Sequence, residues 1–210
     1  MARRISRAAL RTAASVVAAA AVLAVIRPWT VRPLVAPVEA FDASSYATQA
    51  WPRMIEEASR TALDLSKGLH GPAVAAASPA PGRRSVFVTF TGTLAAVDRR
   101  SRVGVARVTL SGGNNGEATV QVGPVIRGTS LRDAASFIRF NDFANQFEFA
   151  AVSNALHERV LRDVIGALDL DALVGQPVTV LGAATVPPGT PPVAVLDVVP
   201  LRITIAGGRR

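Results

Sequence analysis

The stretch from Gln121 to Phe149 holds most of the side chains that could bind a ligand or do acid–base chemistry. It reads QVGPVIRGTSLRDAASFIRFNDFANQFEF and contains five of the eight phenylalanines of the chain. An arginine can grip a carboxylate or a phosphate with two parallel hydrogen bonds, and side-chain amides can bond sugar hydroxyls. The pattern therefore predicts a polar ligand pocket formed by Arg127, Arg132, Asp133, Asn141, Asp142, Asn145 and Gln146.

The same residues also allow a structural interpretation. The phenylalanines would fill the core of a barrel, Asp133 would cap a helix, and Arg127 or Arg132 would pair with Asp133 or Asp142. An enzyme of the cell envelope that uses Arg127, Arg132, Asp133 and Asp142 is a further alternative, and a purely structural envelope protein is another. The residues alone leave these hypotheses open.

Other kinds of chemistry find little support in the sequence. The chain has no cysteine, which excludes disulfides, thiolate metal sites and a cysteine nucleophile. Its two histidines, His70 and His157, belong to no HExxH motif, and neither GxSxG nor a phosphate-binding glycine loop occurs. We therefore expect no metal, no cofactor and no enzymatic activity.

The positive charge of the chain lies mostly at its N-terminus. The formal net charge is +8, yet six arginines fall within the first 35 residues and no acidic residue precedes Glu39. Residues 36–210 hold 17 basic and 15 acidic side chains, a net of only +2. Binding of nucleic acid requires the basic excess on the folded body, where it can neutralise phosphates. We therefore expect no nucleic-acid partner.

An export signal explains the N-terminal arginines. Fifteen uncharged and mostly apolar residues separate Arg11 from Arg27. Such a segment enters a bilayer as a helix, and the preceding arginines stay on the cytoplasmic side. We expect residues 1–27 to be a membrane-anchor helix or a cleaved signal peptide. The anchor makes the protein single-pass in the inner membrane, with its C-terminal domain in the periplasm.

The segment after the anchor combines a spacer with a helix. Residues 28–40 contain three prolines, which predicts an extended spacer. Asp42 or Ser44 can cap a helix that runs to about Leu69, although Pro52 also allows a start near Trp51. The small and proline-rich residues 71–84 predict a surface loop.

The rest of the chain is predicted to be mainly β, with strands at 85–98, 102–110, 117–126, 175–186 and 193–205. Gly92 predicts a bulge or bend in the first strand, and Pro200 an edge or bulge in the last. Between the third and fourth strands we expect a short helix at Ser130 and a longer one from Phe143 to Leu168. This order predicts an α+β, mainly β fold for residues 41–208, an OB-like five-stranded Greek-key barrel with a helix between strands 3 and 4. A generic α+β sandwich is the alternative.

Several motifs resemble an uncharacterised bacterial family of predicted periplasmic lipoproteins. The matching residues are Phe41-Asp42-Ala43 with Tyr46 and Trp51, then Gln121 to Thr129, Arg132-Asp133-Ala134, Phe140 to Phe143, Asn145-Gln146, Asn154, and Gly175 to Gly182. The resemblance implies an OB-like fold, an extracytoplasmic location and, more loosely, genes beside sugar-transport operons. It implies no established activity.

One departure from the family concerns the tether. Family members typically carry a lipobox cysteine, which this chain lacks, so we expect the helix of residues 12–26 to replace the lipid anchor. The combined expectation is a membrane-tethered extracytoplasmic binding or accessory protein of unknown ligand. Its partners would be the membrane, through the N-terminal helix, and a sugar-type transporter or solute-binding protein.

Overall fold

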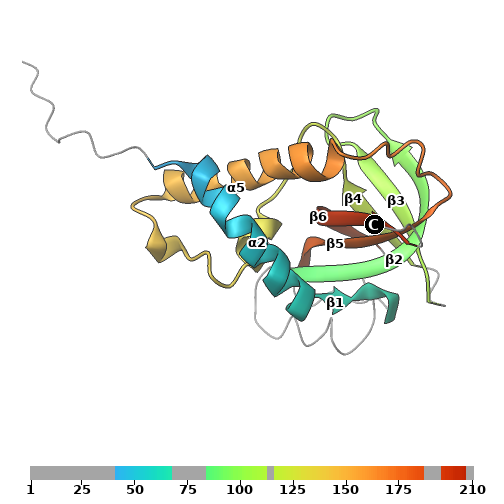
Figure 1. Ribbon diagram of the computed structural model, residues 1–210, viewed down its shortest axis with the longest axis horizontal. Coiled ribbons are helices and arrows are strands. Elements are labelled where there is room, and N and C mark those ends of the chain that lie inside the picture. The colour runs from blue at the N-terminus through green and yellow to red at the C-terminus, as the bar shows by residue number, and fades with distance from the viewer. Residues whose placement is uncertain (1–40, 68–83, 113–115, 187–194, 207–210) are drawn as a thin grey trace, which may run out of the picture. The chain divides into compact units, whose positions relative to one another are not determined.

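Six strands form one sheet in the part of the chain that the computed structural model describes, residues 41–67, 84–112, 116–186 and 195–206. With the helices that cover it, the sheet makes a mixed α+β fold (Figure 1). The predicted anchor at 1–27, the spacer at 28–40 and the loop at 71–84, except Arg84, lie outside these residues. Among the described helices, none is both long and apolar enough to span a bilayer.

The five predicted strands are confirmed, and one short strand was missed. The strands are β1 (Leu63–Asp64), β2 (Arg84–Asp98), β3 (Val105–Leu110), β4 (Glu117–Gln121), β5 (Pro177–Val186) and β6 (Val195–Ile205). Their order is β1-β2-β3-β4-β6-β5, and β2 also pairs with β5. Five strands therefore have a partner on both sides. β4 and β6 run parallel, whereas β2, β3 and β5 pair antiparallel with their neighbours in that ring.

The third strand is shorter than predicted, since β4 ends at Gln121 instead of residue 126. The chain then follows residues 102–103 closely without regular pairing, and the Gly123 amide donates to the Val103 carbonyl at 2.7 Å. A Cβ atom on Gly123 would lie 2.1 Å from that carbonyl oxygen. The close approach requires glycine, and it ends the strand.

Strand β2 belongs to both halves of the sheet because it bends. Residues 84–93 pair with β5, whereas residues from Gly92 onward pair with β3. Gly92 pairs on both sides, and a Cβ there would lie 2.2 Å from the Thr109 carbonyl oxygen. The register shift itself falls between Leu94 and Ala96, just beyond the predicted position.

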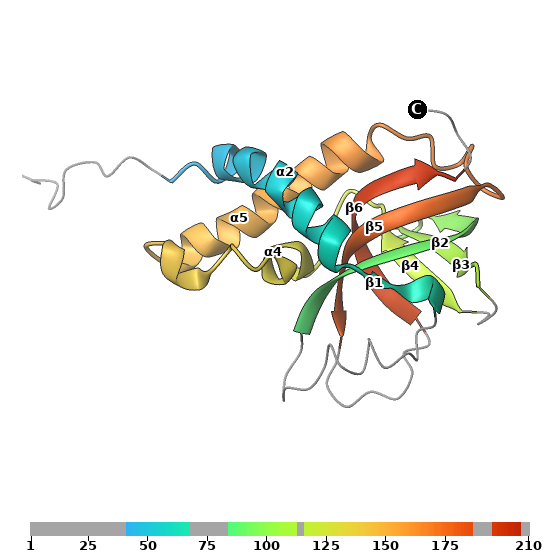
Figure 2. The same cartoon turned by 60° about the horizontal axis from the view of Figure 1, so that its bottom comes forward.

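Alternation along β2, β5 and β6 creates two hydrophobic cores. One core lies inside the sheet and includes Phe90, Val180 and Val198. The other lies between the opposite face and the helices, and includes Phe87 and Leu181. Figure 2 shows the helices along that outer face. Neighbouring residues of one strand thus serve different cores.

Strand β6 carries a register shift beside Pro200. Between Leu181 and Gly182 the partner on β6 jumps from Arg202 to Pro200, so Leu201 is an extra residue. The predicted bulge at Pro200 is therefore confirmed. Val199 and Leu201 both contribute to the helix-side core, and the extra residue lets the next side chain, Arg202, lie on the same outer face.

The first described helix, α2 (Ala43–Thr61), begins at its cap and not near Trp51. The Asp42 carboxylate accepts hydrogen bonds from the amides of Ser44 and Ser45, both at 3.0 Å. Pro52 lies inside the helix, where neighbouring Trp51 and Met54 are buried. Packing of this face outweighs the hydrogen bond that proline removes.

The segment between β4 and β5 contains several helical elements. They are α4 (Ser130–Ala134), η2 (Phe140–Asp142), α5 (Gln146–Arg159) and the π-helical segment η3 (Val160–Ile165). The predicted long helix thus begins later than Phe143, because Asn145 caps it, and it changes to π-helix after Arg159. α5 packs against α2, and α4 packs on β2 and β5.

We expect Gly92→Ala to lower the free energy of unfolding by about 2 kcal/mol or more, because the added methyl group meets backbone atoms that cannot move aside. Urea denaturation measures this loss. Thr93→Ala, on an exposed position of the same strand, is the matched control and should cost less than about 1 kcal/mol. Equal losses in both variants would contradict the steric explanation.

Candidate functional site

The predicted polar cluster divides into residues with different surroundings. Arg132 and Asp133 lie on α4 and are bound to each other. The Arg132 guanidinium contacts the Asp133 carboxylate at 2.7 Å, donates to the Phe149 carbonyl at 3.1 Å and stacks 3.7 Å from the centre of the Phe149 ring. Asp133 also accepts from the Thr129 hydroxyl. These contacts join α4 to α5, and they include an arginine–aspartate pair of the kind that the structural interpretation predicted.

Four other predicted residues lie on or beside α5 and η2. Asn145 is the N-cap of α5, where its side chain accepts from the amides of Phe147 and Glu148. Asn141 and Asp142 lie exposed on η2, and Gln146 is exposed in the first turn of α5. None of these four side chains lines the better-formed pockets of the described residues.

Arg127 belongs to a different site, a polar pocket of about 190 Å³. We call it the Asp197 pocket, and its lining residues are Gln121, Arg127, Gly128, Ser130, Thr185 and Asp197. They come from the end of β4, the loop before α4, and strands β5 and β6. Of the seven predicted site residues, the structure places only Arg127 in this pocket.

A buried glutamine organises the Asp197 pocket. The Gln121 side-chain oxygen accepts from the Arg127 amide at 2.7 Å, and its nitrogen donates to the Arg127 carbonyl at 3.3 Å and to the Asp197 carboxylate at 2.9 Å. Gln121 is almost fully buried. One amide group thus fixes the loop at Arg127 and orients the carboxylate beside it.

The carboxylate of Asp197 lies in surroundings that disfavour its charge. Although much of the residue is exposed at the strand surface, the carboxyl group faces the pocket. Burial raises the pKa of Asp197, while the hydrogen bond from Gln121 and the charge of Arg127 act in the opposite direction. One carboxylate oxygen accepts from Gln121, and the other accepts no hydrogen bond from any described residue. That oxygen is available to a ligand.

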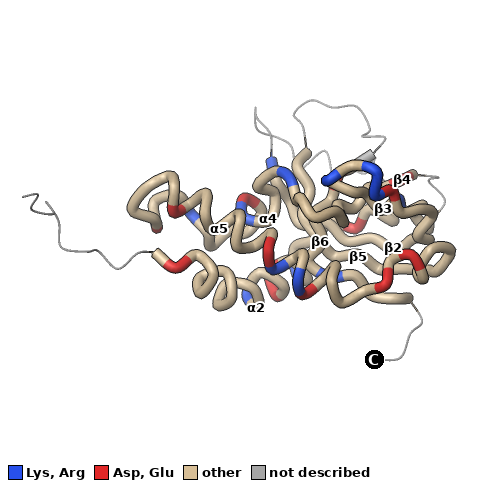
Figure 3. Tube along the Cα trace, turned by 90° about the horizontal axis from the view of Figure 1, so that it is seen from above, with Lys and Arg blue, Asp and Glu red and all other residues tan. Residues whose placement is uncertain are grey.

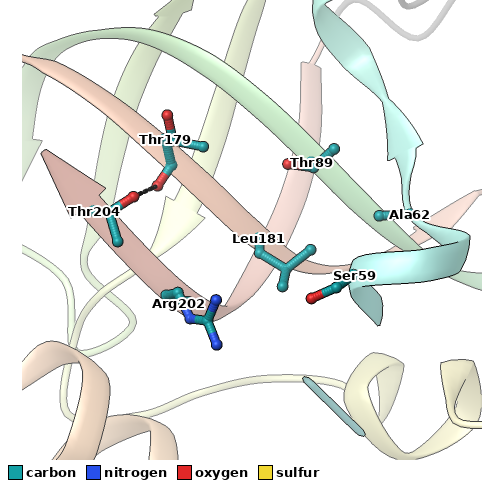
Figure 4. Close-up of a pocket in the computed structure, with 7 residues that line it drawn as sticks. All are labelled: Ser59, Ala62, Thr89, Thr179, Leu181, Arg202 and Thr204. Atoms are coloured by element: carbon teal, nitrogen blue, oxygen red, sulfur yellow. Dashed lines mark hydrogen bonds between the residues drawn. The ribbon is translucent and has the colours of Figure 1, made fainter. Parts of the chain in front are cut away.

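A second, larger groove lies on the outer face of the sheet (Figure 4). Its volume is about 300 Å³, and its lining residues are Ser59, Ala62, Thr89, Thr179, Leu181, Arg202 and Thr204. The hydroxyls of Ser59, Thr89 and Thr204 donate to backbone carbonyls. Arg202 forms no ion pair with another described residue. The groove therefore offers one free guanidinium but no oriented polar network.

Charge is evenly spread over the described residues. Figure 3 shows basic and acidic positions interleaved, and the two kinds are equal in number over the described ranges. Within those ranges no group of three or more acidic, histidine or cysteine side chains is placed to hold a metal ion.

Sequence reasoning missed Asp197, Ser130 and Thr185 as pocket residues. Asp197 carried a signal, since it is the only charged residue in the otherwise apolar run from Val193 to Leu201. Gln121 was quoted in the motif but not assigned to a site. Its role depends on the loop that returns Arg127 to it, which no spacing rule reveals.

The family resemblance is now confirmed over most of the chain. The family described as "Predicted periplasmic lipoprotein (DUF2291)" matches residues 13–204. The chain belongs to this family. No curated protein matches the chain. As a DUF2291 member it is assigned to an extracytoplasmic, membrane-associated group of unknown function.

Solved structures support the fold of this DUF2291 chain. An OB-fold protein from Thermotoga maritima aligns with a TM-score of 0.59 and 16% identity, covering 80% of this chain and 99% of that one. An OBody bound to hen egg-white lysozyme also aligns, over 65% of this chain and 88% of that one. Its TM-score is only 0.28 at 14% identity, so it supports no conclusion. The first match shows the fold alone.

We expect Arg132→Ala to lower the free energy of unfolding by about 2 kcal/mol, because it removes charged hydrogen bonds and a stacked side chain. Arg162→Ala is a matched control, since Arg162 also pairs with the aspartate that follows it. The Arg132 side chain is 11% exposed and that of Arg162 is 64% exposed, so the control should cost less than about 0.5 kcal/mol. Chemical denaturation compares the two. A neutral Arg132→Ala would argue that this network is not structural.

We expect Asp197→Asn to raise the melting temperature at pH 7. The folded state raises the pKa of Asp197, so ionised Asp197 destabilises the fold at every pH above that pKa. The penalty shrinks as the pH falls and disappears below the unfolded value of 3.8, where both states are protonated. Thermal melts between pH 7 and pH 3 should show the variant and the wild type converging at low pH. A constant difference would show that charge is not the cause.

Proposed function

We propose that this protein is a membrane-tethered, extracytoplasmic binding module that takes a small hydroxylated, sugar-type ligand in the Asp197 pocket. In this proposal the five mutually paired strands form the OB-type Greek-key barrel that carries the pocket. The observation that supports it is the Asp197 carboxylate, which Gln121 orients and which keeps one oxygen free of hydrogen bonds from the described residues.

The donors and acceptors of the pocket suit a ligand rich in hydroxyl groups. A carboxylate accepts strong hydrogen bonds from two neighbouring hydroxyls, and the Arg127 guanidinium can donate to others. The side-chain amide of Gln121 forms its hydrogen bonds with Arg127 and Asp197, so it fixes the shape of the pocket before a ligand binds. Preorganisation of this kind reduces the entropy lost on binding.

The size of the pocket limits the ligand. Sites for drug-sized molecules usually measure about 300–1,000 Å³. The Asp197 pocket measures about 190 Å³, which suits a ligand of about monosaccharide size. A ligand of this size agrees with the association with sugar transport that the family resemblance suggested. An accessory role beside a transporter or its binding protein is part of the proposal.

Binding fits the described residues better than catalysis does. The alternative enzyme would use Arg127, Arg132, Asp133 and Asp142, yet Arg132 and Asp133 are engaged with each other and with α5. Asp142 lies exposed on η2, and Arg127 lies in the separate Asp197 pocket. These positions offer no shared cavity in which the four could act together.

The tether is the second part of the proposal. Family membership supports association with the membrane from the extracytoplasmic side. The 210 residues contain no cysteine to carry a lipid, whereas residues 12–26 are uncharged and follow four arginines. We therefore assign the tether to this apolar segment, with a single crossing of the inner membrane and the folded domain in the periplasm.

Isothermal titration calorimetry of the full chain in detergent micelles tests the binding proposal. The probes are neutral pentoses and hexoses, with hexuronates to test for an added charge. We expect saturable binding of at least one neutral sugar, weakened tenfold or more in Asp197→Asn and Arg127→Gln, as loss of about 1.4 kcal/mol would produce.

Arg202→Gln is the control variant, because Arg202 lies in the other groove and should leave the affinity unchanged. Absence of binding by every sugar in the panel would refute the ligand assignment. Affinity that depends on Arg202 and not on Asp197 would move the site to the groove of Figure 4.

A further inference from the structure

Two phenylalanines stand out on the surface of the described domain. Phe147 is 76% exposed and Phe140 is 53% exposed, more than any other large hydrophobic side chain in the described ranges. Phe140 lies on η2 and Phe147 in the first turn of α5. Exposed aromatic rings are costly in water, so two in one short segment indicate a contact surface.

The Phe140 ring packs on a cluster of aromatic rings, and the backbone of Phe147 is fixed by a helix cap. Phe140 packs edge-on against Phe149 at 5.4 Å between ring centres, and Phe149 contacts Phe143 at the same distance. The chain of contacts continues from Phe143 to Phe41 at 5.5 Å and to Tyr46 at 5.4 Å. Asn145 also bonds the amide of Phe147. We call the exposed Phe140 and Phe147, with this supporting ring cluster, the aromatic tip.

The aromatic tip lies where the described domain begins. Phe41 is the first described residue, and Figures 1 and 2 show the starts of α2 and α5 at the end of the helical layer that points away from the sheet. Residues 27–40 separate Phe41 from the apolar segment of residues 12–26. Fourteen residues can span about 48 Å when fully extended, so the tip can reach the surface of the membrane that holds the anchor.

We propose that the aromatic tip inserts Phe140 and Phe147 into the headgroup region of the membrane to which the chain is tethered. Phenylalanine side chains bury their apolar surface at this boundary, about 5–10 Å deep in interfacial segments. The docking would orient the domain, with the sheet held away from the lipid. This proposal rests on the tether in the proposed function.

The charges around the tip indicate a hydrophobic contact and not an electrostatic one. Arg139 is exposed beside Phe140, but acidic Glu148 is adjacent to Phe147, and Asp142 follows Phe140 by two residues. Asp42 adds a further carboxylate next to Phe41. Anionic lipid should therefore add little to the depth of insertion, unlike the case of a polybasic surface.

Spin labels can measure the depth of the tip, because the chain has no native cysteine. The full chain is reconstituted into phosphatidylcholine vesicles as Phe147→Cys or as the control Val174→Cys, each carrying a nitroxide. Val174 is also an exposed hydrophobic residue, 44% accessible, but it lies just before β5. We expect the label at 147 to be accessible to oxygen and protected from a water-soluble nickel complex, and the label at 174 to show the reverse.

A label at position 147 removes the side chain whose insertion is tested, so a second pair of variants carries the label elsewhere. A nitroxide at the exposed Ala150 of α5 should lie near the lipid in the native background and become at least threefold more accessible to nickel in Phe140→Ser/Phe147→Ser. The depth at 147 should also be unchanged when one fifth of the lipid is phosphatidylglycerol.

The outcomes separate docking from tethering. If the protein floats with the vesicles while the label at 147 remains in water, the docking proposal is wrong and the tether stands. If the protein does not float with the vesicles, the tether is wrong and docking falls with it. Protection at 147 from both oxygen and nickel would indicate a protein contact, and would overturn the assignment to lipid.

Discussion

The burial of β2, β5 and β6 on both faces is the constraint on which the rest of the structure depends. The inner face closes around Phe90, Val180 and Val198, and the outer face requires a cover of its own for residues such as Leu181. Helices α2 and α4 and the π-helical segment η3 contact the strands, and α5 adds side chains to the same core. Because the helices must lie on one side of the ring of strands, the segment between β4 and β5 has to leave the sheet, cross its outer face and return.

The Asp197 pocket forms where the segment between β4 and β5 leaves the sheet. The chain leaves β4 at Gln121, makes a tight loop and enters α4, and the amide of Gln121 ties the loop back to the strand. β6 lies parallel to β4 and brings Asp197 beside the same amide. A single buried glutamine thereby connects the topology of the sheet to the geometry of the proposed binding site.

Arginines with similar sequence surroundings have different roles in this protein. Arg132 and Arg162 are each followed by aspartate, yet Arg132 is stacked and buried whereas Arg162 is exposed. Arg127 lies close to Arg132 in sequence but belongs to another site. Arg132 is covered because the ring of Phe149, on α5, lies against it. Residue type and local spacing carry no information about such a partner.

The sequence alone determined the five main strands, their order with the intervening helices, and the bulge at Pro200, because alternation, glycine and proline act over short distances. It also predicted the family, which residues 13–204 confirm. Only the tertiary structure decided the start of α2, where the packing of Trp51 overrides Pro52, and the end of β4 at Gln121. The tertiary structure also placed Arg127 in a different site from Arg132. It brought Arg127 next to Asp197, 70 positions away in the sequence, because β4 and β6 pair in parallel.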